Sequence, residues 1–556
     1  VLFLGLTLLS PFPRPVQLSG TAVTLIFYAV LAGDEGPVVR ATIMALIMLG
    51  GQGLGRKGEG LNSLALAAAI MLIYNPNYLT DPGFQLSVAA TWGLVALIPC
   101  LAHGMGGLHP QLRELLLFPV AATIATLPLL AYYFYQVSIV GIAANILVTW
   151  FLGLILEIGL IAVSIGLIVP FAGQTLLLPV GLLIKFTLWV LGMMAKVPGA
   201  ALWVIRPAGF GIACYYLGLL LLINWPAVKT KFSGRRDLPK AGSKAGEVKA
   251  AALTKNGAAA GIFAVVLLVS LIVLLPSGLF GFSSKRQLEV DFLDVGQGDS
   301  ILITTPGQRH YLIDGGPRSA AFDSGAAIVR PFLLNKGIKS LDGIFVTHLH
   351  DDHTGGLVEV VETFPIKRIY FAPDSGTVAE NQGQWPLLKH GLLKHKLAVV
   401  TLKKGNRLNL DNGVTARVLS PESPYTGTRS DPNNNSLVLW LSYGNYNILL
   451  TGDIEMEALA DLHDQLGKVD VLKQPHHGSK YGLDREAWDS INPQAVIVSV
   501  GRNNFGQPAP EILRYWQERG IPVLRTDHDG LVAVKTDGHK LEFFLGRQQN
   551  KALLKR

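Results

Sequence analysis

The sequence HLHDDH at residues 348–353 carries the strongest chemical signal in the chain. It follows the apolar run at 342–347 and precedes a threonine and two glycines, which indicates a loop at the end of a strand. A single histidine is usually structural, but three histidines and an aspartate in an HxHxDH frame are hard to explain by packing. Imidazole nitrogens and carboxylate oxygens suit zinc or manganese, and alternate residues of such a loop can face two ions. The candidate metal ligands in this loop are His348, His350, Asp352 and His353.

Further acids and histidines end other predicted strands. Asp453 ends the run NILLTGD, and His476 and His477 follow VDVLKQP. A carboxylate at such a position can bridge two cations, as in two-metal hydrolases. Asp299 and Asp314 also lie at strand ends, but buried turn aspartates often bond only backbone N–H groups. We therefore expect those two to support the ligands.

The elements that must position these residues are short β-branched runs separated by Gly, Asp and Asn, from about residue 287 onward. Amphipathic stretches, which predict helices, lie between some of these runs. They occur at 326–336, 355–363, 455–466 and 509–519. Strands with interspersed helices predict a mixed α/β layered domain at 286–548.

Charged residues divide the chain into two unlike halves. Residues 1–285 hold 17 Lys+Arg and 8 Asp+Glu, whereas residues 286–556 hold 30 and 31. The first half therefore resembles a membrane protein and the second a soluble one. The net charge of +8 lies in the first half, so it does not indicate a basic nucleic-acid-binding face. The two cysteines exclude a disulfide framework and a Cys-rich zinc site.

Several runs in the first half have the length of about 20 apolar residues that a spanning helix needs. The clearest lie at 85–102, 115–135, 150–170, 174–195 and 208–224, and shorter or interrupted runs at 1–12, 18–33, 41–50, 61–74 and 138–149. Interrupted runs are typical of backbone that lines a water-filled cavity. The runs within residues 1–225 thus predict a membrane domain that contains a water-filled pathway. The alternative is a membrane domain built of short packed helices.

Residues 226–256 are polar and hold eight Lys+Arg against two acids. This composition predicts a mobile linker, which the positive-inside rule places in the cytoplasm. The apolar run at 257–280 is long enough to cross the membrane once. If it crosses rather than re-enters, the C-terminal domain lies on the extracytoplasmic side of the cytoplasmic membrane.

Several motifs together resemble a known family. HLHDDH resembles the HxHxDH signature of the metallo-β-lactamase superfamily, and FLDVGQGDS, LIDGG, LLTGD and LKQPHHGS look like the version carried by the ComEC family of DNA-uptake channel proteins. The segment RATIMALIMLGG and the stretch from LNSLALAAAIMLIYNPNYL to PGFQLSVAATWG are similar to that family's competence domain. The resemblance implies a polytopic α-helical membrane domain followed by an αββα metallo-β-lactamase-like domain. We expect the family's N-terminal oligonucleotide-binding-like domain to be absent from this chain.

The resemblance also implies roles for individual residues. His348 and His350 would hold one divalent ion, Zn or Mn, with Asp453 as the bridge between two ions. The second ion would be held by Asp352, His353 and His477, and less surely by His476. Asp352 or His476 would manage a proton during hydrolysis.

Two departures from the family pattern affect these expectations. The superfamily's third-motif histidine has no match, and Asn435 and Ser436 lie in its region, so the first ion is expected to be weaker or more open. Where the family shows Tyr-Gly-His-Pro, residues 505–508 read FGQP. Gln507 can only form hydrogen bonds there, which puts activity in doubt if that position assists proton transfer.

The function implied is DNA uptake in natural transformation. The membrane half would transport single-stranded DNA across the cytoplasmic membrane, while the C-terminal domain hydrolyses the other strand. The expected partners are single-stranded DNA, the lipid membrane and competence proteins that deliver and receive DNA, and a homo-oligomer is compatible with a channel. Two alternatives remain open: a membrane-tethered metallo-hydrolase of a different ester, and a channel whose C-terminal domain binds DNA without cutting it.

Overall fold

The computed structural model describes residues 13–33, 36–53, 60–102, 109–223, 287–373 and 383–547. The chain divides into two compact units, Val1–Leu279 and Phe280–Arg556, and each is described by itself. The apolar run at 1–12, the basic linker at 226–256 and the spanning helix at 257–280 lie outside the described residues. They stay predictions.

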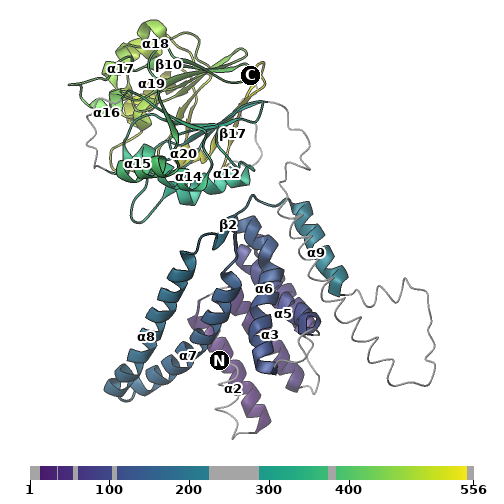
Figure 1. The fold of residues 1–556 in the computed structure, drawn as a ribbon. Coiled ribbons are helices and arrows are strands. Elements are labelled where there is room, and N and C mark those ends of the chain that lie inside the picture. The colour runs from purple at the N-terminus through teal and green to yellow at the C-terminus, as the bar shows by residue number, and fades with distance from the viewer. Residues whose placement is uncertain are drawn as a thin grey trace, which may run out of the picture. The chain divides into compact units, whose positions relative to one another are not determined.

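The described part of the N-terminal unit is almost entirely helical (Figure 1). Its helices are α2 (Arg14–Leu31), α3 (Gly36–Gly53), α4 (Gly60–Tyr74), α5 (Pro82–Ala102), α6 (Pro110–Phe134), α7 (Gly141–Gly166), α8 (Pro170–Ala195) and α9 (Gly209–Ile223). Within the described residues, four helices are long and apolar enough to cross a membrane, and they lie in α5, α6, α7 and α8. This confirms the expected polytopic helical fold. A short two-stranded sheet pairs β1 (Gln136–Ser138) with β2 (Ala201–Trp203).

Small residues allow α5 and α6 to pack closely. A Cβ atom at Gly93 of α5 would lie 2.5 Å from the Ala125 Cβ and 2.7 Å from the Ala121 carbonyl oxygen of α6. The Tyr216 hydroxyl of α9 donates to the Ala125 carbonyl oxygen at 2.9 Å. Contact between small residues is the usual way in which membrane helices approach one another.

Helix α7 corrects one detail of the hydropathy pattern. The runs at 138–149 and 150–170 were expected to be separate, but Gly141–Gly166 is one continuous helix. The Thr149 hydroxyl at the expected break donates to the Asn145 carbonyl oxygen at 2.6 Å, one helical turn earlier. A polar side chain that bonds its own helix in this way does not interrupt it.

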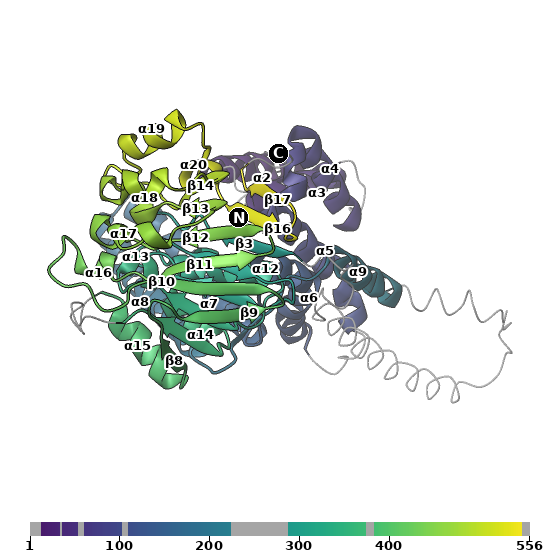
Figure 2. The ribbon, with the colours of Figure 1, turned by 90° about the horizontal axis from the view of Figure 1, so that it is seen from above.

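The C-terminal unit contains two β-sheets. One has eight strands, β3 (Leu288–Phe292), β4 (Ile301–Thr304), β5 (His310–Ile313), β6 (Gly343–Val346), β7 (Arg368–Phe371), β8 (Ala398–Thr401), β16 (Val532–Thr536) and β17 (Leu541–Leu545), in the order β17-β16-β3-β4-β5-β6-β7-β8. The other has seven, β9 (Arg407–Asp411), β10 (Val414–Ser420), β11 (Val438–Tyr443), β12 (Tyr446–Leu450), β13 (Val471–Lys473), β14 (Ala495–Val498) and β15 (Val523–Arg525). These seven follow the order β15-β14-β13-β12-β11-β10-β9, which Figure 2 shows from above.

The two sheets share one apolar core. Phe292 and Phe345 of the first sheet and Ile448 of the second belong to a single buried cluster. Leu449, next to Ile448, belongs instead to a cluster on the other face of its sheet, with Trp488 and with helix α19 (Pro510–Glu518). Because successive strand residues point to opposite faces, each central strand is buried on both sides.

Helices cover the outer faces of this double layer. Helices α17 (Met456–Ala460), α18 (Arg485–Asp489) and α19 lie on one side in Figure 1, and α12 (Arg330–Asn335), α14 (Leu357–Thr363) and α15 (Trp385–Lys394) on the other. The layers confirm the expected αββα fold. Strands β5 to β8 are parallel, as are β12 to β15, so the carboxyl ends of each set share one edge of the unit.

Candidate metal centre

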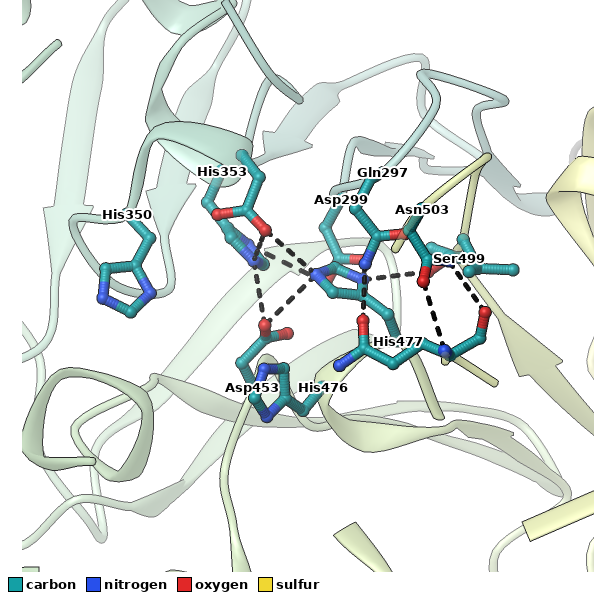
Figure 3. A network of polar contacts seen from close by, with 12 residues as sticks. Gln297, Asp299, His350, His353, Asp453, His476, His477, Ser499 and Asn503 are labelled. Atoms are coloured by element: carbon teal, nitrogen blue, oxygen red, sulfur yellow. Dashed lines mark hydrogen bonds and ion pairs between the residues drawn. The ribbon is translucent and has the colours of Figure 1, made fainter. Parts of the chain in front are cut away.

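The predicted metal-binding residues follow the carboxyl ends of strands in both sheets. The HxHxDH segment comes directly after β6, Asp453 after β12, and His477 after β13. The segment was expected to be a loop throughout, but its last three residues lie in the short helix α13 (Asp351–Thr354). Open α/β sheets generally bind ligands at this edge, because the loops that follow parallel strands converge there. Figure 3 shows that His353, Asp453 and His477, which are distant in sequence, point toward one another.

Four residues form the centre of the site. Asp352, His353, Asp453 and His477 each present a ligand atom, and these atoms all lie within 4.8 Å of one another. The Nε2 atoms of His353 and His477 are each 3.2 Å from Asp453 Oδ2, and His477 Nε2 is 3.3 Å from Asp352 Oδ2. Asp352 is partly exposed, whereas the other three are buried. The structure thus brings together the set assigned to the second ion.

Hydrogen bonds on the far side of each ring fix how the two buried histidines face the centre. The Nδ1 atom of His353 lies 2.8 Å from Asp314 Oδ2, and that of His477 lies 2.9 Å from the Ser499 carbonyl oxygen. Both Nε2 atoms are left buried without a hydrogen-bond partner. Outer partners of this kind orient a metal-binding imidazole and set its tautomer. Asp314 therefore supports a ligand, as its place at a strand end suggested.

The carboxylates make this centre favourable for positive charge. Burial lowers the pKa of His353, yet Asp453 and Asp352 raise it well above its ordinary value. Burial also lowers the pKa of His477, but Asp453 and Asp352 raise this pKa, and the result is a value of about 10. Burial raises the pKa of Asp453, but His477 and His353 hold it well below the usual range. The two imidazolium groups therefore occupy a field that would also bind a divalent cation.

The backbone at the centre adopts unusual conformations. His476 and His477 have φ values of 47° and 54°, in the left-handed region that side chains other than glycine rarely adopt. Such residues cost about 1–3 kcal/mol each and cluster at functional sites. At Gly298, a Cβ atom would lie 2.1 Å from the Asp352 carbonyl oxygen, so only glycine lets the loop after β3 approach the HxHxDH loop.

His348 and His350 lie beside this group rather than within it. The Nε2 atom of His348 is 3.1 Å from His350 Nδ1, and His348 Nδ1 is 3.2 Å from the hydroxyl of Ser436. Burial, together with His353 and His350, holds the pKa of His348 well below its usual value, so it is a neutral ring. Ser436 thus lies against His348 from the region where the third-motif histidine was expected.

The two remaining predicted residues lie at the rim. His476 Nδ1 is 2.9 Å from Glu455 Oε1, and its ring centroid is 6.1 Å from that of His477. The Gln507 side-chain oxygen accepts a hydrogen bond from the Gln297 amide at 2.6 Å. Proton-transfer roles for Asp352, His476 and Gln507 stay predictions.

Lys473 is the main residue that the sequence reasoning missed. Its side chain is completely buried, and its ammonium forms an ion pair with Asp299, donates to the Gly452 carbonyl oxygen at 2.8 Å and lies 3.4 Å from Asp453 Oδ1. The available signal was a lysine at the end of the apolar strand VDVLK, three residues before the first of the two histidines. Buried lysines are rare unless they are paired.

The donor set fits a divalent metal ion. Two buried imidazole Nε2 atoms without hydrogen-bond partners face two carboxylates, and this mixture of nitrogen and oxygen suits zinc or manganese. Asp352, His353, Asp453 and His477 would hold such an ion. His348 and His350 supply neutral nitrogens beside it, which would belong to the other ion, the first of the two expected.

Two family models match the chain. The model described as "Competence protein" matches residues 1–229, and the model of the "Metallo-beta-lactamase superfamily" matches residues 293–502. The first therefore covers the helical part and the second covers the strands and loops that carry the candidate metal centre.

Characterised relatives match over most of the chain. "ComE operon protein 3" of Bacillus subtilis is 28% identical over 522 residues, 91% of this chain and 62% of the relative. "Competence protein ComA" of Neisseria gonorrhoeae is 26% identical over 97% of this chain and 66% of the relative. "Recombination protein 2" of Haemophilus influenzae is 25% identical over 86% and 58%. The chain spans about three fifths of the length of these relatives.

Proposed function

Because the chain belongs to the ComEC family of competence proteins, which joins a competence domain to a metallo-β-lactamase domain, we propose that it acts in DNA uptake during natural transformation. In this proposal the helical part transports single-stranded DNA across the cytoplasmic membrane. The C-terminal domain hydrolyses phosphodiester bonds of the other strand. The description of the matching family model, "Competence protein", and the name of the relative "Competence protein ComA" support the uptake role.

The four-residue group is the observation that carries the hydrolytic half of the proposal. Asp352, His353, Asp453 and His477 converge at one edge of the domain with their ligand atoms within 4.8 Å. Bound divalent ions, two in this proposal, would activate a water molecule and neutralise phosphate charge. A phosphodiester fits because its transition state carries spread negative charge.

The chain's own groups have distinct tasks in this reaction. Asp314 and the Ser499 carbonyl orient the rings of His353 and His477, so that each Nε2 faces the centre. Glu455 holds His476 at the rim, where His476 can pass a proton to the leaving oxygen. Asp352, with a side chain 34% exposed, is the ligand that solvent and substrate reach.

Cleavage of DNA by the full chain tests this proposal. We would purify the chain in detergent, load it with Mn²⁺ or Zn²⁺, and follow a labelled single strand. We expect cleavage that chelation abolishes and that Asp352→Asn strongly reduces. Asp351→Asn is the matched control, because Asp351 is the neighbouring acid and its Oδ1 accepts from the Gln384 backbone instead of facing the centre.

The outcome also separates the alternatives. DNA binding without cleavage by metal-loaded protein would favour a channel whose C-terminal domain only binds. Turnover of another ester with no action on DNA would favour a tethered hydrolase of different specificity. Transport is tested separately, by uptake of labelled single-stranded DNA into vesicles that contain the chain.

We further propose that the C-terminal domain lies outside the cytoplasm. The support is the basic composition of residues 226–256 and the apolar run that follows it. A cysteine replacing His528, whose side chain is 80% exposed, in a background without Cys100 and Cys214, reports the side. We expect a membrane-impermeant thiol reagent to label it in intact spheroplasts. Labelling only after lysis would place the domain in the cytoplasm.

A further inference from the structure

A cavity of about 230 Å³ opens beside the candidate metal centre. It lies among the ends of β6, β7 and β8 and helix α15, and most of its wall is apolar. The side chains that shape it are Phe371, Trp385, Leu392, Val399 and Thr401, with His348. The proposed roles of the metal ligands and of the residues that orient them do not require this cavity.

Its size and walls suit one flat ring. A cavity of about 150 Å³ holds benzene, and pockets for whole drug-sized ligands begin near 300 Å³. The rings of Phe371 and Trp385 meet edge to face, with centroids 5.8 Å apart. A planar group that enters between such walls gains stacking and apolar contact.

Two polar side chains of the wall, Asn435 and Thr347, are already bonded to the protein. The Asn435 amide accepts from the Tyr425 backbone N–H at 2.6 Å and donates to the Tyr425 carbonyl oxygen at 3.1 Å. The Thr347 hydroxyl donates to Asp314 at 2.7 Å. The cavity would therefore recognise a ring by shape and stacking, which tolerates different rings of similar size.

His348 connects the cavity to the metal centre. Its ring lines the cavity, and its centroid is 4.2 Å from that of His353. A ring in the cavity is thus separated from the ligand group by the thickness of a side chain. A phosphate attached to that ring through a sugar would reach the centre.

An arginine stacked on an aromatic ring lies on the same segment. Pro432 and Asn435 line the cavity, and Arg429, three residues before Pro432, is exposed, pairs with Glu455, and places its guanidinium 3.4 Å from the centroid of the Tyr481 ring. Arginine and aromatic groups beside a stacking pocket are typical of sites that bind single-stranded nucleic acid.

We propose that this cavity binds one nucleobase of the DNA strand whose phosphodiester lies at the metal centre. The inference rests on the proposed function and specifies how the strand is held. Stacking without a hydrogen-bond pattern would let the site accept any sequence.

Base removal in the substrate tests the inference on the full chain in detergent with Mn²⁺. The probe is a short single strand with one cleavable phosphodiester and phosphorothioates elsewhere, compared with strands that lack the base on one side of that bond or the other. We expect removal on one side to lower kcat/KM about 5- to 150-fold, the effect of one stacked base. Removal on the other side should change it little.

Filling the cavity provides the matched test. Val399 lines the cavity and is 55% exposed, so Val399→Trp adds a ring there without emptying a core. Leu393→Trp adds the same ring at a 70% exposed position of α15 that does not line the cavity. We expect V399W to cleave intact and base-lacking strands with equal kcat/KM. L393W should keep the wild-type difference in kcat/KM between these strands.

Each outcome separates this inference from the proposed function. Cleavage that is indifferent to the base on both sides, or a full base effect in V399W, would overturn the cavity assignment alone. If the wild type cuts nothing, fluorescence anisotropy with all-phosphorothioate strands, intact and base-lacking, still tests whether the cavity binds a base. Tighter binding of the intact strand, lost in V399W, would support the cavity while the nuclease proposal fails, and equal binding of both strands would overturn the cavity.

Discussion

Replacement of Lys473 by Met should destabilise the C-terminal domain strongly when no metal is bound. The Lys473 ammonium is completely buried and contacts Asp299 and Asp453, which are 1% and 2% exposed. The variant leaves two buried carboxylates without this cation. Breaking a buried ion pair costs about 3–5 kcal/mol. At about 2–4 °C per kcal/mol for a domain of this size, Tm should fall by roughly 6–20 °C.

Thermal unfolding of the chelator-treated full chain measures this effect. The matched control is Lys468→Met, because Lys468 also pairs with an aspartate, Asp470 at 3.1 Å, but its side chain is 69% exposed. Asp470 is buried, but it keeps hydrogen bonds from the Asn447 backbone N–H and the Gln494 amide when Lys468 is replaced, and water solvates the Lys468 ammonium, so this loss should cost only about 1 kcal/mol. Added Mn²⁺ or Zn²⁺ returns positive charge beside Asp453, so the metal should raise Tm more in K473M than in the wild type. Equal Tm values for metal-free K473M and metal-free K468M would refute the reasoning.

Three further outcomes are expected. His477→Ala should lower metal affinity at least about tenfold by titration, whereas binding as tight as in the wild type would exclude His477 as a ligand. Burial, aided by Glu289 and opposed by Lys336, raises the pKa of Asp291 to about 6. The folded chain therefore holds this proton more tightly than the unfolded chain, and the contribution of Asp291 to stability falls as pH rises from about 4 to about 6. The Asp291→Asn variant does not have this loss, so the stability of the variant relative to the wild type should rise by roughly 3 kcal/mol over this pH range. Parallel profiles of stability against pH for the two proteins would contradict this expectation. Gly93→Ala should lower Tm because of the contact with α6, while Gly153→Ala, with open space around it, should not, and equal effects would show that α5 and α6 can separate.

The candidate ligand residues were readable from the sequence because each lies in a short local pattern. Asp352 and His353 belong to one motif, and Asp453 and His477 each follow an apolar run. Strand ends in a layered α/β domain converge on one edge, so a local pattern at each strand predicts a common site. The helical fold was readable for a similar reason, since the length and hydropathy of a run are properties of contiguous residues.

Long-range charge pairing was not readable in this way. Lys473 and Asp299 are far apart in sequence, and each alone looks like an ordinary charged residue near a strand end. Only the packing of β13 against the loop after β3 removes both from water and makes each necessary to the other. The length of α7 escaped prediction because the hydroxyl of Thr149 bonds within the helix, which composition does not reveal.

The charges around the centre show what a bound metal would change for an anionic substrate. Without metal, His353 and His477 carry protons that offset part of the charge of the carboxylates of Asp299, Asp314, Asp352 and Asp453. A metal ion would displace those protons, and these four carboxylates would then face Lys473 as the one remaining cation of this group, so the ligand set alone is negative and repels a phosphodiester. One divalent ion offsets part of this charge, and a second makes the centre attractive to an anion. The rest of the domain cannot supply the attraction, because residues 286–556 hold nearly equal numbers of basic and acidic side chains. In the proposed function, attraction of DNA phosphate would therefore be concentrated at the metal centre, and the adjoining cavity would act on the base, which carries no charge.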